Sequence, residues 1–121
     1  MASSAIKSTA VRYIVNSNGE AWQFPDGMMI CVKNVSVKNI NFNIAFGSLY
    51  QNSDSWDGGS WAVEFLDKPY ISANPVLSGG AMFLGNFNNT SKSAVGSCAI
   101  YRPTTAIVNV SIDIIAIGRW K

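Results

Sequence analysis

Acidic side chains are the residues of this sequence that are best suited to acid–base chemistry. The 121 residues include seven Asp and Glu residues and no His. Hydrolysis of a glycosidic bond requires two carboxyl groups that face each other across a cleft, one of them with a raised pKa. Asp54 and Asp57 are close in sequence, but they share one loop instead of standing on two rigid walls. We therefore predict no catalytic residues and no enzyme activity.

The sequence also lacks the usual ligands of a metal ion or cofactor. Histidine is absent, and Cys31 and Cys98 lie too far apart in sequence for a zinc motif. Two carboxylates in one loop, without the spacing of a known calcium motif, are weak support for calcium. We expect no metal site and no cofactor. The apolar alternating segments around both cysteines favour buried, reduced thiols over a disulfide.

Saccharide binding has simpler requirements than catalysis or metal binding. It needs aromatic faces for the apolar side of a pyranose and planar acceptors or amides for its hydroxyl groups. The aperiodic segment 49–59 and the residues next to it supply these types, and Phe87, Asn88 and Asn89 form a second candidate loop. Trp56 lies in a polar stretch, so we expect it to be exposed and to be the main recognition residue. Trp61 is equally well explained as a core residue. The predicted ligand-binding residues are Trp56, Asp54, Asp57, Tyr50, Asn52, Trp61 and Asn88.

The charge pattern argues against several classes of partner. The net charge is +2, and the nine Lys and Arg residues occur without the basic run or stripe of a nucleic-acid-binding protein. No segment approaches the roughly 18 apolar residues of a membrane span, so we expect no membrane insertion. The first eight residues lack the basic-then-apolar order of a secretory signal, so we expect no secretion through one.

The elements that position these side chains are expected to be β-strands. Residues 108–114 alternate apolar and polar, as in a strand with one buried and one wet face. Over residues 114–117 both faces are apolar, so this end needs a second sheet or another copy of the chain to cover it. Hydrophobic residues make up 48% of a chain of single-domain size. The pattern predicts an all-β fold, an antiparallel β-sandwich of six to eight strands.

Other segments refine this prediction. The apolar residues of 40–46 fall on one face and are out of phase with those of 35–37, so a bulge or turn is needed near residues 38–39. Two prolines bracket residues 70–74, which suits an edge strand or a crossover. The diglycine at 79–80 predicts a bulge or bend. Further strands are expected over 28–32, 60–66, 76–84 and 94–101.

Two stretches resemble one family of phage proteins. Residues 18–31, NGEAWQFPDGMMIC, look like the W-x-F-P-D-G-x-x-I-C opening of many bacteriophage tail-fibre C-terminal domains. Residues 112–121, IDIIAIGRWK, look like the W-x-A-I-G-R-W end of the same domains, with Ile114 where the first aromatic residue is usual. This end also resembles the last strand of H-type lectin domains. Residues 63–76 are a weaker match, and residues 40–60 have no counterpart that can be aligned.

The resemblance implies a lectin-like sandwich that assembles as a homotrimer at the tip of a phage or prophage tail fibre. It also implies contact with a polysaccharide or glycan of the host cell surface, and a location in the virion tail fibre after synthesis in the host cytoplasm. Residues 18–121 would form the receptor-binding domain, and residues 1–17 an N-terminal shaft end or interchain segment. The residues expected at the oligomer interface are Ile115, Ile117, Arg119 and Trp120.

Two other functions fit the same residues. The chain could be a structural module that trimerises or caps a tail fibre while another segment binds the host. It could also be a free-standing lectin similar to the H type. The first alternative has no ligand of its own, and the second has no place in a virion.

Overall fold

The computed structural model describes residues 10–76 and 81–121, and all the regular structure in these ranges is β-strand. The strands pair only in antiparallel fashion. The predicted all-β class, the antiparallel arrangement and the number of strands are confirmed. The strands are β1 (Arg12–Asn16), β2 (Gly19–Gln23), β3 (Met28–Phe46), β4 (Leu49–Asn52), β5 (Tyr70–Val76), β6 (Phe83–Leu84), β7 (Ile100–Arg102) and β8 (Ala106–Arg119).

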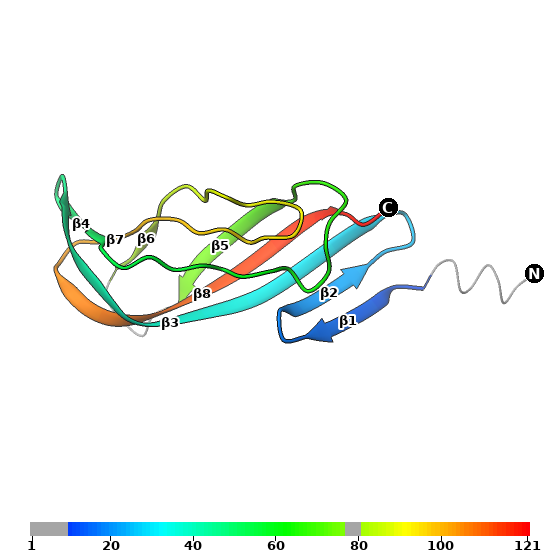
Figure 1. Cartoon of the computed structure of the whole chain (residues 1–121), viewed down its shortest axis with the longest axis horizontal. Helices are drawn as coiled ribbons and strands as arrows, with labels where there is room; N and C mark the ends of the chain where they lie inside the picture. Colours follow the sequence, from blue (N-terminus) through cyan, green and yellow to red (C-terminus); the bar gives the residue numbers. More distant parts are fainter. Residues whose placement is uncertain (1–9, 77–80) are drawn as a thin grey trace, which may run out of the picture.

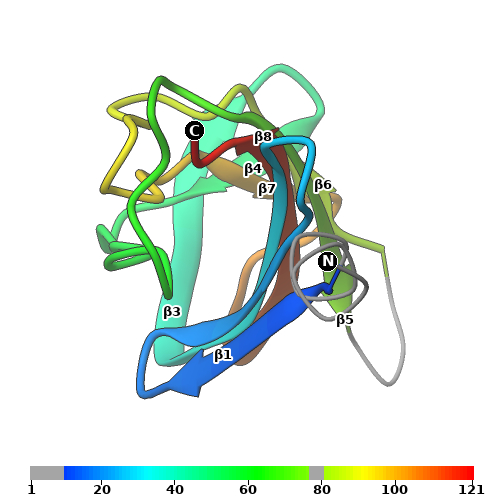
Figure 2. The same cartoon turned by 90° about the vertical axis from the view of Figure 1, so that its right-hand side faces the viewer.

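Two long strands, β3 and β8, organise the fold and run side by side along the molecule (Figure 1). Near the C-terminus the sheet has the order β1-β2-β3-β8-β5. Toward the other end β4 replaces β2 as the neighbour of β3, and the order becomes β8-β3-β4-β7-β6. Seen from the end of the molecule (Figure 2), the sheet is curled across its strands, so it has an inner face toward the core and an outer face.

Irregular chain forms the layer that packs on the inner face of the sheet (Figure 1). Residues 53–69 and 85–99 make up this covering layer, and they bond to each other at separate points, such as Trp61 N to Ser93 O (3.1 Å). The strand predicted over 60–66 is wrong, because these isolated bonds do not form a continuous ladder. The strand expected over 94–101 is reduced to its last residues, which belong to β7.

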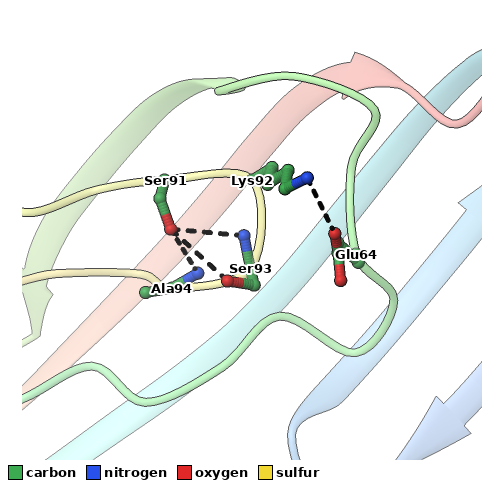
Figure 3. A network of polar contacts seen from close by, with 5 residues as sticks. All are labelled: Glu64, Ser91, Lys92, Ser93 and Ala94. Carbon is green, nitrogen blue, oxygen red and sulfur yellow. Dashed lines mark hydrogen bonds and ion pairs between the residues drawn. The ribbon is translucent and has the colours of Figure 1, made fainter.

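A serine holds the turn of the second covering segment. Ser91 Oγ accepts the backbone N–H groups of Ser93 (3.3 Å) and Ala94 (3.0 Å) (Figure 3). Next to this turn, Lys92 Nζ lies 3.5 Å from Glu64 Oε1 of the first covering segment. Because this ion pair is exposed, it contributes little to the free energy of unfolding. Backbone hydrogen bonds and buried side chains therefore hold the two covering segments together.

The core lies between the sheet and the covering layer. Sheet residues such as Met29 and Phe42 belong to the same buried cluster as Trp61 and Phe65, whose rings pack edge to face at 5.8 Å. Both cysteines are free and buried, which confirms the prediction of buried, reduced thiols. Burial raises the pKa of the Cys31 thiol and raises that of Cys98 to about 11, so both thiols stay protonated at neutral pH.

Strand β3 contains two irregularities that decide which of its side chains are buried. The first lies between Val37 and Ile40, where Asn39 has a φ of 58°, and it confirms the bulge predicted at residues 38–39. The second lies between Phe42 and Ile44. It leaves Ile40 and Phe42 in the core but turns Ile44 and Phe46 to the outside. The expectation that all four residues share one face is therefore wrong.

The segment with two prolines is an edge strand, as predicted. Strand β5 pairs with β8 and with no other strand in the part of the chain that the structure describes. The strand expected over 76–84 is divided, since β5 ends at Val76 and β6 begins at Phe83. The bend predicted at residues 79–80 lies outside the described residues. Strand β1 pairs with β2, so residues 12–16 belong to the same sheet.

The close approach of the two covering segments at Gly58 yields a test of the fold. A Cβ atom on Gly58 would lie 2.6 Å from Val95 Cβ and 2.8 Å from Gly96 O. We predict that Gly58→Ala lowers the free energy of unfolding by about 1–3 kcal/mol, as overpacking does in other cores. Urea denaturation followed by tryptophan fluorescence measures it. The control is Gly85→Ala, whose new Cβ would be 3.2 Å from its nearest neighbours. It should lower the free energy of unfolding by less than Gly58→Ala does. Equal stability of Gly58→Ala and the parent would contradict this packing.

Candidate functional site

Trp56 lies in the core and not in solvent. Its side chain is 7% exposed, and its Nε1–H donates to Cys98 O at 2.8 Å. The ring of Phe87 packs against it edge to face at 5.9 Å. The expected exposure of Trp56 is therefore wrong. An indole can be buried where a carbonyl accepts its N–H, and the polar sequence neighbours give no sign of such an acceptor.

Four of the predicted ligand-binding residues line one polar hollow of about 290 Å³, namely Asn52, Asp54, Trp56 and Asn88. Asn52 Oδ1 accepts the backbone N–H of Ile100 (2.9 Å), while its Nδ2 donates to Asp54 O (2.6 Å). These bonds hold one side of the hollow in place. Amide, carboxylate and serine groups around the hollow offer both donors and acceptors, which suits a ligand rich in hydroxyl groups.

The other three predicted ligand-binding residues lie elsewhere. Trp61 is a core residue whose Nε1–H donates to Ser91 O at 3.2 Å. Asp57 is exposed, and its Oδ1 accepts the backbone N–H of Gly59 at 3.0 Å. Tyr50 is half-buried in β4. The structure therefore brings together the residues of 52–56 with Asn88, but not these three.

The carboxylates of the loop have local structural partners. Asp54 Oδ2 accepts the backbone N–H of Asn41 at 2.9 Å, as Asp57 does for Gly59. Over residues 10–76 and 81–121, no group of three or more His, Cys, Asp or Glu side chains is placed to hold a metal ion. The same residues include no helix of the length and apolarity that crossing a bilayer requires.

A lysine connects the sheet to the loop that carries these residues. Lys33 Nζ, on β3, donates to Gly58 O (2.6 Å) and Ser60 O (2.9 Å). Burial lowers the pKa of Lys33, and the nearby charge of Asp57 partly opposes this shift. The amine thus fixes the position of residues 58–60 on the inner side of the sheet.

The outer face of the sheet carries a continuous apolar row near the C-terminus. Tyr13, Trp22, Ile30, Ile117 and Tyr70 are successive cross-strand neighbours on β1, β2, β3, β8 and β5. Tyr70 is 87% exposed, and Ile117 is also exposed. We call these five residues the proximal row. Such a large apolar surface is unusual on a monomeric protein.

A second row lies beside the proximal row and is partly polar. Glu20, Val32, Ile115 and Ser72 are cross-strand neighbours, and they line a groove of about 510 Å³ on the outer face. Ile115 is exposed, as Ile117 is. The strand end that is apolar on both faces is thus present as predicted, with one face in the core and the other open within this chain.

The end of the chain packs on its own opening turn. Trp120 donates from its backbone N–H to Gly27 O and from Nε1 to Phe24 O, both at 2.9 Å. Arg119 Nη2 donates to Asp26 O of the same turn. Arg119 is exposed and Trp120 half-buried. These two predicted interface residues therefore bond to residues of their own chain, whereas Ile115 and Ile117 are exposed on the outer face.

Sequence reasoning missed a second apolar region, at the end of the molecule opposite the C-terminus (Figure 1). Tyr101 on β7 has Gln51 and Phe83 as cross-strand neighbours, and Gln51 has Ile44. The rings of Phe46 and Tyr101 lie 5.1 Å apart at 44°. We call Ile44, Phe46, Gln51, Phe83 and Tyr101 the distal platform. It exists because of the second bulge in β3, which no sequence pattern signals.

No family model matches the chain, and no curated protein matches it. Among solved structures the chain is similar to an N-truncated R1-type pyocin tail fiber, with a TM-score of 0.61 and 11% sequence identity. The match covers 98% of this chain and 96% of that chain. At this identity the likeness shows a shared fold alone.

The position of Trp56 generates a prediction about stability. We expect Trp56→Ala to lower the free energy of unfolding by about 3–5 kcal/mol, because it removes a buried ring. Trp56→Phe should lower the free energy of unfolding by less, because it keeps an aromatic ring in the core. It should still be less stable than the parent, because Cys98 O loses its hydrogen-bond donor. Urea denaturation measures both variants. If Trp56→Ala were as stable as the parent, the indole would not be part of the core.

Proposed function

We propose that this protein is a non-enzymatic module of a phage or phage-like tail fibre, located in the virion tail, that assembles as a homotrimer and binds a host cell-surface saccharide. The observation that carries the proposal is the fold shared with the R1-type pyocin tail fiber over nearly the full length of both chains. The motifs at residues 18–31 and 112–121 point to the same class.

Assembly accounts for the outer face near the C-terminus. The proximal row and the adjacent Val32 and Ile115 form an apolar surface that spans five strands. Burying such a surface between copies would supply a large hydrophobic contribution. Ile115 and Ile117 would lie at the interface itself, and Arg119 and Trp120 would hold the strand end behind it through their bonds to the opening turn.

Saccharide binding accounts for the polar hollow. Asn52, Asp54 and Asn88 offer amide and carboxylate groups around a space of about 290 Å³, close to the lower limit for small-ligand sites. Three identical shallow sites on one trimer would gain avidity on a surface with dense receptors. Weak binding by one site is therefore compatible with adhesion.

A structural module that caps or trimerises a fibre is the second candidate. The burial of Trp56 favours it, because it removes the residue expected to stack on a sugar. A solved structure with the same fold is a tail fiber, which favours both tail-fibre proposals over a free-standing H-type lectin. Binding to polysaccharide separates the two tail-fibre proposals.

Assembly is tested by placing a charge in the proximal row. We expect the parent protein to have three times the 13.1 kDa chain mass, and Ile117→Asp to dissociate or unfold it, because an unpaired charge would be buried at the interface. Multi-angle light scattering measures the mass. Leu66→Asp is the control, since Leu66 is also apolar and exposed but lies in the covering layer. A monomeric parent, or an unchanged mass for Ile117→Asp, would contradict the assembly.

The hollow is tested by removing an amide from its wall. We expect Asn88→Ala to weaken binding of the trimer to immobilised bacterial lipopolysaccharides and capsular polysaccharides by at least about tenfold, through loss of hydrogen bonds that a hydroxyl-rich ligand requires. Surface plasmon resonance measures the binding. Asn86→Ala is the matched control, because Asn86 is an exposed asparagine of the same segment that does not line the hollow. If no polysaccharide binds the parent, the structural module becomes the favoured function.

A further inference from the structure

The distal platform is an apolar surface that forms where the pairing of β3 with β4 is irregular. The irregularity between Phe42 and Ile44 reverses the alternation of β3, so Ile44 and Phe46 point outward although the preceding residues point into the core. Phe46 is 58% exposed and Phe83 is 52% exposed. Bulges that redirect side chains are common next to functional sites. Two exposed phenylalanines on one small surface beside such a bulge therefore suggest a binding surface.

The distal platform is separate from the proximal row. Between the two regions the outer faces of β3 and β8 carry polar residues, and Asn34 Nδ2 donates there to Ser111 Oγ (2.7 Å) and Asp113 Oδ1 (2.8 Å). A single apolar interface between copies would therefore have to cross a polar band. The distal platform also lies at the opposite end of the molecule from the C-terminus (Figure 1). Both observations disfavour a second copy as its occupant.

The chemistry of the platform indicates a neutral, amphipathic ligand. The rings of Phe46 and Tyr101 are neighbours at 5.1 Å, and the Gln51 amide stands directly beside Tyr101 in the cross-strand pairing. None of the platform residues is charged, and the neighbouring Arg102 places its guanidinium over the ring of Phe42, a core residue, at 5.7 Å. A pyranose has an apolar face for such rings and hydroxyl groups at its edge for an amide.

The platform is continuous with the polar hollow. Gln51 lines the hollow and is also the cross-strand partner of Tyr101. Adjacent strands are ~4.8 Å apart, so the row from Ile44 to Phe83 is roughly 14 Å long, with room for more than one sugar ring. A linear saccharide could therefore place one unit against the aromatic rings and the next unit in the hollow.

From these observations we infer that the distal platform stacks on a pyranose unit of a neutral polysaccharide, whose neighbouring unit occupies the polar hollow. This inference rests on the proposed saccharide-binding function and names its aromatic subsite. Phe46 and Tyr101 would provide the stacking surface that the buried Trp56 does not. Gln51 would connect the two subsites, and Phe83 would border the platform on the β6 side.

The experiment uses the complete protein on an array of purified bacterial lipopolysaccharides and capsular polysaccharides. We expect Phe46→Ala to reduce binding by roughly tenfold, through loss of one aromatic contact, and Phe46→Tyr to retain it. Leu66→Ala removes an exposed apolar side chain from the covering layer and should leave binding unchanged. Phe83→Ala is a second variant at the other side of the platform, and thermal unfolding checks that each variant is folded.

The outcomes separate this inference from the function on which it rests. Binding that falls with Phe46→Ala or Phe83→Ala, but not with Leu66→Ala, supports the aromatic subsite. Binding that survives both variants but falls with Asn88→Ala overturns the subsite and leaves the proposed function intact. Absence of binding by the parent overturns both. A lower assembly mass for Phe46→Ala would show that the platform contacts a second copy, which also overturns the inference.

Discussion

The pairing of β3 with β8 is the interaction on which the rest of the structure depends. The two strands are neighbours from Met28 and Arg119 to Phe42 and Ala106, with one bulge between. One face of this pair carries most of the buried sheet residues, and the covering layer packs on it. The other face is also apolar near the C-terminus. A sheet that is apolar on both faces favours cover on both, so the pairing that forms the core also forms the surface on which the proposed assembly rests.

Bulges in β3 divide the outer face into regions of different chemistry. Before the first bulge the outward residues are those of the proximal row and the polar band, and after the second they are those of the distal platform. The first region is broad, and it suits copies of the chain. The second is small, lies beside a polar hollow, and suits a ligand with apolar and hydroxyl-bearing faces. In the proposed function, one curled sheet would thereby separate the surface for assembly from the surface for recognition.

The sequence predicted features that depend on local alternation and missed those that depend on distant partners. The all-β class, the bulge at Asn39 and the edge strand β5 follow from the phase of apolar residues and from proline chemistry. The burial of Trp56 depends on a carbonyl 42 residues away, which no local pattern contains. Residues 60–66 of the first covering segment resemble a strand in composition. They form no strand, because the covering segment 85–99 to which they bond is irregular. The two end motifs belong together because Trp120 bonds the turn at Phe24.

Hydroxyl-radical footprinting tests most directly whether the two apolar regions have different occupants. In one chain Tyr70 is 87% exposed and Phe46 is 58% exposed, so both would react if the protein were alone. At concentrations where the protein is assembled and no saccharide is present, Tyr70 should be protected while Phe46 and Phe83 remain reactive. Reaction of Tyr70 at the rate of an unstructured peptide, or equal protection of Phe46, would contradict the account.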